Sequence, residues 1–257
     1  MKKPFKIVVV SGKGGVGKSM LASSLAMLFA APVKLCHGAG KKVVAVDCDV
    51  DAPNLHLWLG QDENWDKVER ISVSERAVID KKKCTGCGRC VDICAFGAIE
   101  MTEGKPVVNK FFCEGCGACE IVCPQKAIKM VPVKNAEVRI KENVYGFPLV
   151  SAQLYPGETG SGKIVDQIKE KAEGFEYEMM ILDAPAGTGC PVIAAVNGAN
   201  FAVLVTEPTP SGFSDMKRAL TVVNNFKIPY GVVVNKWNIN PDKSSKIESW
   251  SKDNFLG

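Results

Sequence analysis

Short apolar runs alternate with longer amphipathic stretches along most of the chain. Six runs are rich in valine and isoleucine and are bounded by glycine, proline or an acidic residue, a pattern typical of buried parallel strands. They cover residues 6–10, 43–46, 148–152, 179–182, 202–205 and 231–234. Apolar residues at helical spacing follow several of these runs, at residues 21–28, 164–172 and 216–226. Strands that alternate with helices predict right-handed crossovers around a parallel sheet, so we expect an α/β fold.

A duplicated segment interrupts this alternation between the second and third predicted strands. Residues 78–101 align with residues 107–130 at an offset of 29, and eleven of the 24 aligned positions are identical. Each copy carries the pattern Cys-x-Gly-Cys-Gly-x-Cys, with a fourth cysteine four residues later. We therefore predict a small α+β domain at 77–135, inserted into an α/β domain that comprises 1–76 and 136–257.

The composition is that of a globular protein. Of the 257 residues, 46% are hydrophobic and 23% are charged. The formal net charge of +4 comes from 32 basic and 28 acidic residues spread along the chain, so no basic stripe points to nucleic acid or to an anionic membrane surface. No apolar run approaches the roughly 18 residues of a spanning helix, and residues 11–15 cut the first run below the length of a signal-peptide core. We expect a cytoplasmic protein.

The first predicted strand leads into a glycine-rich loop. Residues 12–19 match the P-loop pattern G-x-x-x-x-G-K-[ST], and a helix opens at Met20. Such glycines let backbone N–H groups wrap a phosphate, while Lys18 bridges the terminal phosphates and the Ser19 hydroxyl reaches magnesium. The sequence therefore predicts a Mg-nucleotide site. Its phosphate-binding residues are predicted to be Gly12, Gly14, Gly15, Val16, Gly17, Lys18, Ser19 and Met20.

A second glycine-rich stretch, residues 157–163, repeats the G-x4-G-K spacing. Ile164 stands where the magnesium-binding hydroxyl would be, so the stretch is not predicted to bind a second nucleotide. We interpret it as a flexible glycine loop that leads into the helix at Ile164.

Carboxylates follow two of the predicted strands. Asp47 and Asp49 come after the second strand, and Asp183 comes after the fourth. Because the carboxyl ends of parallel strands meet at one edge of a sheet, these side chains are candidates to hold magnesium and the attacking water. Asp51 lies close by and is expected to be a solvated loop residue.

The end of the last predicted strand bears on the choice of base. Its sequence, Asn-Lys-Trp-Asn at 235–238, resembles the guanine-reading pattern Asn-Lys-x-Asp with the aspartate replaced by Asn238. This replacement favours adenine, so we expect ATP as the nucleotide and Asn235 as one of its contacts.

Eight of the eleven cysteines form two runs of C-x2-C-x2-C-x3-C, the spacing of bacterial ferredoxins. In two-cluster ferredoxins the fourth cysteine of each run binds the other cluster. Two zinc sites are the competing interpretation, but the third cysteine at short spacing and the duplication of the whole run favour 4Fe-4S clusters. The two predicted cluster sites are Cys84, Cys87, Cys90 and Cys123, and Cys113, Cys116, Cys119 and Cys94.

The glycine loop and the aspartate segments together resemble one family. Lys13, with the rest of its loop, resembles the deviant Walker A box of the MinD/ParA ATPases, in which the early lysine crosses a dimer interface to the partner's phosphates. Asp47 and Asp49, followed by Pro-Asn at 53–54, look like the switch segment of that family, and Asp183 with the four residues after it looks like Walker B. By this resemblance Asp49 orients the attacking water, while Asp47 and Asp183 hold the magnesium shell.

With its inserted cysteines, the chain is similar to a MinD-superfamily subgroup of ATPases that contain an inserted two-cluster ferredoxin domain. The resemblance implies an ATP-dependent homodimer with Lys13, Lys18 and Asp49 as catalytic residues. Such ATPases usually continue through one more strand and helix, so we expect a sheet that lacks them or a shortened sequence. No basic amphipathic helix like the membrane-targeting tail of MinD is visible, so we expect no membrane anchor.

Three cysteines lie outside the two runs: Cys36, Cys48 and Cys190. We expect Cys48 and Cys190 to be small buried thiols near the nucleotide, with a cluster bridged between subunits as the alternative for Cys190. His37 and His56 have no ligand-like neighbours in the sequence.

Two classes of function follow from these predictions. In the first, which we favour, the insert accepts electrons, dimer closure on ATP changes its position or potential, and hydrolysis resets it. In the second, the protein is an iron–sulfur assembly or delivery factor whose ATPase controls cluster handover. Stable ligation by eight cysteines counts against a labile scaffold. The sequence names neither the redox donor and acceptor nor a cluster-receiving protein.

Overall fold

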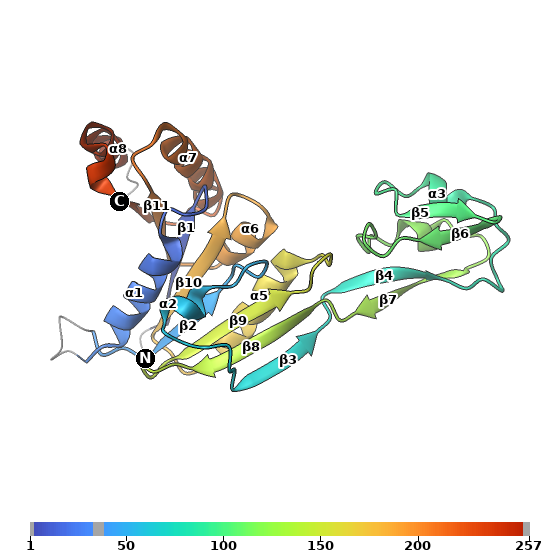
Figure 1. Ribbon diagram of the computed structural model, residues 1–257, viewed down its shortest axis with the longest axis horizontal. Helices are drawn as coiled ribbons and strands as arrows, with labels where there is room; N and C mark the ends of the chain where they lie inside the picture. Colours follow the sequence, from blue (N-terminus) through green and yellow to red (C-terminus); the bar gives the residue numbers. More distant parts are fainter. Residues whose placement is uncertain (1–2, 33–38, 254–257) are drawn as a thin grey trace. The chain divides into compact units, whose positions relative to one another are not determined.

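The computed structural model describes residues 3–32 and 39–253, which form two compact units (Figure 1). The larger one, here called the sheet unit, comprises Met1–Glu69, Val138–Gln153 and Ser161–Gly257. The smaller one, here called the cysteine unit, comprises Arg70–Glu137 and Leu154–Gly160. The chain therefore passes from one unit to the other at four places.

A single large sheet forms the framework of the sheet unit. Its strands are β1 (Phe5–Ser11), β2 (Val43–Asp47), β3 (Lys67–Ile71), β8 (Ala136–Glu142), β9 (Pro148–Leu154), β10 (Met179–Ala186), β11 (Phe201–Thr206) and β12 (Tyr230–Val234). Their order is β12-β11-β1-β10-β2-β9-β8-β3, and the pairs from β12 to β9 are parallel. Every residue of β2 is buried, as expected for a parallel strand in the centre of a sheet that helices cover.

Helices connect the parallel strands, and one more follows the last strand. They are α1 (Lys18–Ala30), α2 (Leu55–Trp58), α5 (Ser161–Glu173), α6 (Cys190–Val196), α7 (Pro210–Asn225) and α8 (Pro241–Asp253), with a 3₁₀ turn η1 (Trp237–Ile239). The start of α7 shows how the sequence sets such bounds. The Thr209 hydroxyl accepts the N–H of Gly212, and Pro210, whose φ is preset for a helix, is the first helical residue.

The predicted parallel α/β sheet is confirmed. All six predicted strands are present, as β1, β2, β9, β10, β11 and β12. The three predicted helices are present as α1, α5 and α7. The apolar pattern missed β3 and β8, which complete the sheet beyond β9. In β3 four of the five residues are exposed, so this edge strand carries no apolar alternation that could reveal it.

The cysteine unit contains two antiparallel ribbons and two short helices. In the ribbons, β4 (Ser74–Ile79) pairs with β7 (Ile128–Val133), and β5 (Ile99–Thr102) pairs with β6 (Lys105–Val108). The helices α3 (Arg89–Asp92) and α4 (Ala118–Ile121) occupy equivalent positions of the two sequence copies. Each ribbon joins one copy to the other, so the duplicated halves share a single small core. It consists of Ala77, Cys90, Ile99, Cys119 and Ile128.

The cysteine unit is larger than the 77–135 insert of the prediction. Asn135, which is fully buried, holds the additional segments together through its side chain. Its Oδ1 accepts the N–H of Val73 at 3.0 Å, and its Nδ2 donates to the carbonyl of Thr159 at 2.6 Å. One amide thus joins the beginning of the cysteine unit to its last segment, the loop at 154–160.

The 154–160 loop has further contacts within the cysteine unit. Both carboxylate oxygens of Glu158 accept from the Arg76 guanidinium at 3.0 Å. Gly157 has φ +77, and a Cβ there would lie 3.0 Å from the ring of Phe111, so the aromatic ring packs against the glycine backbone. The predicted glycine loop is therefore a packed segment, and α5 begins at Ser161 rather than at Ile164.

Candidate functional site

The glycine-rich loop runs from the end of β1 to Lys18, the first residue of α1. Gly15 and Gly17 have φ values of 75° and 100°, a left-handed conformation that favours glycine. A Cβ at Gly17 would also lie 2.5 Å from Nδ2 of Asn235, and one at Gly12 would collide with the carbonyl of Asp215. The loop can adopt this shape only because glycines occupy these positions.

A pocket of about 440 Å³ opens above this loop, within the size range of small-molecule sites. Its lining includes the predicted residues Gly14, Gly15, Gly17, Lys18, Ser19, Met20, Asp49 and Asn235. It also includes Asn54, Trp58, Ala186 and Lys236, which were not among the predicted ligands. Asn54 and Ala186 lie in the two aspartate segments and Lys236 follows Asn235, whereas no sequence signal pointed to Trp58. The pocket lining does not include Gly12, Lys13, Val16, Asp47 or Asp183.

Asp47, the last residue of β2, and Asp183, three residues before the end of β10, lie side by side as register partners. Each is 1% exposed. Asp47 accepts the N–H groups of Asp49 at 3.1 Å and Leu55 at 2.9 Å. Asp183 accepts the Ser19 hydroxyl, while its Oδ1 is buried without a hydrogen-bond partner. The three predicted magnesium ligands are thus brought together at one sheet edge.

Burial raises the pKa of both carboxyls. The pKa of Asp183 rises to about 6, mainly because of burial, against the opposing effects of Ser19 and Lys18. The pKa of Asp47 lies well above its ordinary value because of burial and then because of the neighbouring Asp183. A hard divalent cation would supply the missing counter-charge and a partner for the orphaned oxygen, so these side chains fit magnesium.

Asp49 is positioned by the turn that follows β2. Its Oδ1 accepts the N–H of Ala52 at 3.3 Å, and the residue lines the nucleotide pocket. Burial raises its pKa, while the Ala52 hydrogen bond and the charge of Lys18 oppose that rise. The carboxylate thus stands beside the phosphate loop, where it can orient a water molecule.

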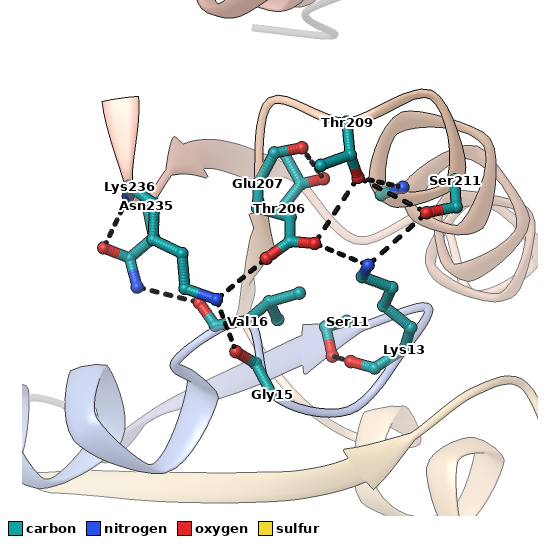
Figure 2. A network of polar contacts seen from close by, with 11 residues as sticks. Ser11, Lys13, Gly15, Val16, Thr206, Glu207, Thr209, Ser211, Asn235 and Lys236 are labelled. Carbon is teal, nitrogen blue, oxygen red and sulfur yellow. Dashed lines mark hydrogen bonds and ion pairs between the residues drawn. The ribbon is translucent and has the colours of Figure 1, made fainter. Parts of the chain in front are cut away.

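Lys13, the early lysine of the loop, is bound within its own chain (Figure 2). Its Nζ lies 2.5 Å from Oε1 of Glu207 and 3.4 Å from the Ser211 hydroxyl. Glu207 follows β11 and also pairs with Lys236 at 2.9 Å. Glu207 was not predicted from the sequence, because a single acidic residue after a strand forms no motif with distant lysines.

Two further, small pockets, each of about 20 Å³, lie in the cysteine unit. Each is lined by four cysteines, three from one run and the fourth from the other. The first set is Cys84, Cys87, Cys90 and Cys123, and the second is Cys94, Cys113, Cys116 and Cys119. Within the described residues, no three or more His, Cys, Asp or Glu side chains converge tightly enough to hold a single metal ion.

The cysteine loops depend on the same backbone features in both copies. Gly88 and Gly117 have φ values of 78° and 76° and precede α3 and α4. The sulfurs of the fourth cysteines accept backbone N–H groups at 3.3 Å, Cys94 from Ala98 and Cys123 from Ala127. Such N–H donors stabilise negative charge on thiolate sulfur.

The remaining thiols differ from each other. Cys48 is fully buried, as predicted. Cys190 is exposed, so the prediction of a buried thiol is wrong there: it is the first residue of α6, at an open helix end. His56 is buried, whereas Cys36 and His37 lie outside the described residues. None of the helices in residues 3–32 and 39–253 combines the length and apolarity needed to span a lipid bilayer.

Comparisons with known proteins agree with the nucleotide site. The profile of the CobQ/CobB/MinD/ParA nucleotide binding domain matches residues 7–257. An uncharacterised protein of Methanocaldococcus jannaschii is 40% identical over 91% of this chain and 79% of its own length. An iron-sulfur cluster carrier protein of Pyrococcus horikoshii is 25% identical over 96% of this chain and 67% of its own length. The septum site-determining protein MinD of P. horikoshii, solved with Mg-ADP, shares the fold with a TM-score of 0.52 and 19% identity, over 95% of this chain and 77% of that one.

Proposed function

Since the chain belongs to the CobQ/CobB/MinD/ParA family of nucleotide-binding domains, we propose that it is an ATPase that couples ATP-driven dimer switching to electron transfer through two 4Fe-4S clusters. The nucleotide part follows from the family. The clusters, the homodimer and the coupling are the proposal. The cysteine pockets support the clusters, the path of the chain supports the coupling, and the family supports the homodimer.

The nucleotide pocket supports the roles proposed for its residues. Lys18 and the loop N–H groups bind the phosphates, and Ser19 with Asp47 and Asp183 holds magnesium. Magnesium, when bound, neutralises charge that develops on the phosphates. Asp49 orients the attacking water. Once the dimer closes, Lys13 binds the phosphates of the nucleotide that the partner subunit holds.

The observation that carries the redox proposal is the composition of the two cysteine pockets. Each draws three cysteines from one run and the fourth from the other, which is the ligand exchange of two-cluster ferredoxins. In a zinc site with four cysteine ligands all four sulfurs meet one ion at about 2.3 Å, whereas in the described residues no three or more such side chains converge closely enough to hold a single ion. A 4Fe-4S cluster, when bound, supplies one-electron transfer.

The path of the chain supports coupling. Asp47, Asp49 and α2 precede β3, from which the chain enters the cysteine unit. On the return, the 154–160 loop belongs to the cysteine unit and leads directly into α5 of the sheet unit. A change at the nucleotide that moves the segment after β2 therefore pulls on the first connection to the cluster-bearing unit.

Cluster delivery is the second candidate function. One observation favours it: Cys87 and Cys116, one predicted ligand from each run, are exposed and open to exchange with another protein's thiols. The similarity to an iron-sulfur cluster carrier protein, at 25% identity, also favours delivery. The other six cysteines of the runs are buried or half-buried, which favours clusters that stay in place.

Anaerobic purification with iron, sulfide and zinc analysis tests the clusters. The proposal requires about eight irons and eight acid-labile sulfides per chain. About two zinc ions without sulfide would replace it with a structural zinc module.

Midpoint potentials in the apo, ADP and non-hydrolysable ATP forms then test coupling, since a tenfold change in ATP affinity on reduction corresponds to a shift of about 59 mV. Equal potentials in all three forms would favour the delivery function.

A further inference from the structure

Glu207 connects two lysines that approach its carboxylate from opposite sides (Figure 2). Oε1 binds Nζ of Lys13 at 2.5 Å, and Oε2 binds Nζ of Lys236 at 2.9 Å. The Glu207 side chain is only 13% exposed, so both ion pairs are partly shielded from water. One carboxylate thus holds a lysine of the phosphate loop and a lysine that follows β12.

The Lys236 side of this arrangement supports the phosphate loop. Lys236 also donates to the carbonyl of Gly15 at 3.1 Å, and Asn235 donates to the carbonyl of Val16 at 2.9 Å. Lys236 has φ 56° and ψ 39°, a left-handed conformation that a non-glycine residue rarely adopts. Such strain persists where the surrounding contacts impose it, which here are the bonds to the loop and to Glu207.

The ion pair between Lys13 and Glu207 keeps Lys13 from acting in a partner subunit. A lysine whose Nζ is paired with Glu207 cannot reach across a dimer interface until that pair is broken. Lys13 and then Lys236 hold the pKa of Glu207 at about 2, so protonation does not release Lys13 at neutral pH. The release therefore needs a competing anion, and the triphosphate of a bound nucleotide is an anion of the required charge.

We propose that Glu207 is a positioning residue that retains Lys13 on its own chain, and that closure of the ATP-bound dimer requires the exchange of this carboxylate for the partner's phosphates. The inference rests on the proposed action of Lys13 across a dimer interface. It adds a condition for dimerisation: the nucleotide phosphates of the partner chain must bind Lys13 more strongly than Glu207 does. Without nucleotide, two chains therefore do not form the closed dimer.

The test compares Glu207→Gln with Lys236→Ala in the cluster-loaded protein. Sedimentation with a non-hydrolysable ATP analogue gives the dimer dissociation constant, and steady-state kinetics give KM and kcat. Glu207→Gln keeps the shape but removes the charge that retains Lys13. The dimer should therefore tighten by up to about 25-fold, because each of the two chains no longer breaks an ion pair, and a partly exposed pair contributes at most about fivefold. Lys236→Ala should raise the KM for ATP, because the Gly15 carbonyl loses its donor, without tightening the dimer.

Glu248→Gln is the matched control, since it removes the same charge from an exposed ion pair with Lys252 on α8. It should behave like the wild type. Glu207→Asp, which keeps the charge but is too short to span both lysines, gives a second measurement if Glu207→Gln unfolds early. A wild-type dissociation constant in both Glu207 variants, or equal tightening in Lys236→Ala, overturns the inference.

Lys13→Ala separates this inference from the function on which it rests. If Lys13→Ala hydrolyses ATP at the full rate, the action of Lys13 across the dimer is wrong, and the retention by Glu207 has no consequence. If Lys13→Ala loses turnover while the Glu207 variants dimerise like the wild type, the ATPase mechanism stands and only the role of Glu207 is wrong.

Discussion

Replacement of Asp183 by asparagine should stabilise the magnesium-free protein at neutral pH. Burial raises the pKa of Asp183 from 3.8 to about 6, and its Oδ1 has no hydrogen-bond partner. Because the folded pKa is raised, this carboxyl favours folding below about pH 4, and that contribution is lost as the pH rises through about 6. The shift corresponds to about 3 kcal/mol for the ionised form at pH 8. The substitution also relieves Asp47 of a repulsive negative charge, since the pKa of Asp47 is raised partly by Asp183.

Thermal unfolding in magnesium-free buffer at pH 8 and pH 4.5 measures this effect. At pH 8, Asp183→Asn should unfold roughly 6 to 12 °C above the wild type, at about 2–4 °C per kcal/mol for a chain of this size. At pH 4.5 the difference should fall to about a third of its value at pH 8, because the folded carboxyl is then protonated while the unfolded one is still largely ionised. With Mg-ATP the order should reverse, since magnesium supplies the counter-charge that only the aspartate can use.

The control variant for this prediction is Asp51→Asn, an exposed aspartate in the same segment as Asp47, for which no change is expected at either pH. The reasoning is refuted if Asp183→Asn is less stable than the wild type at pH 8. It is also refuted by an equal gain at both pH values, because an effect of shape alone does not depend on the ionisation of the replaced group.

Three further predictions concern the nucleotide and the clusters. Lys18→Ala should weaken ATP binding itself, whereas Lys13→Ala should slow turnover with binding largely intact; isothermal titration and single-turnover kinetics separate the two, and equal binding losses would contradict the assignment. Cys123→Ala should remove the cluster held by the first cysteine run, and Cys94→Ala the other; EPR would show the opposite assignment if each run bound its own cluster. ATP should outcompete GTP at equal magnesium, since Asn238 lacks a carboxylate for guanine, and tighter GTP binding would contradict this.

The parts of the fold and site that the sequence predicted are those with local signals. The central strands are buried on both faces and therefore read as continuous apolar runs. The phosphate loop needs glycine at fixed positions, as the left-handed Gly15 and Gly17 illustrate. The missed strand β3 is exposed and polar, so its place in the sheet depends on pairing with β8 rather than on its own pattern.

Long-range electrostatic contacts left no comparable signal. Glu207 meets Lys13 and Lys236 only in the folded chain, where β11 places it beside the phosphate loop and the end of β12. The residues next to it in the sequence give no sign of these contacts. The exposure of Cys190 was mispredicted for a related reason. A cysteine in an apolar stretch usually packs inside, but this one starts α6, and a first helical residue is free to face solvent.

The second glycine stretch also depends on contacts that are distant in the sequence. Its sequence suggested flexibility, yet Glu158 is paired with Arg76, and the loop belongs to the cysteine unit. Immediately after it, in the sheet unit, Gly162 lies so close to Cys190 that an added Cβ would be 3.2 Å from that residue's Cβ. Cys190 begins the helix that follows the Asp183 segment. If the proposed coupling operates, a shift of the 154–160 loop should pass through the start of α5 to Cys190 and the helix that follows Asp183, because closely packed backbone leaves no gap that could absorb it.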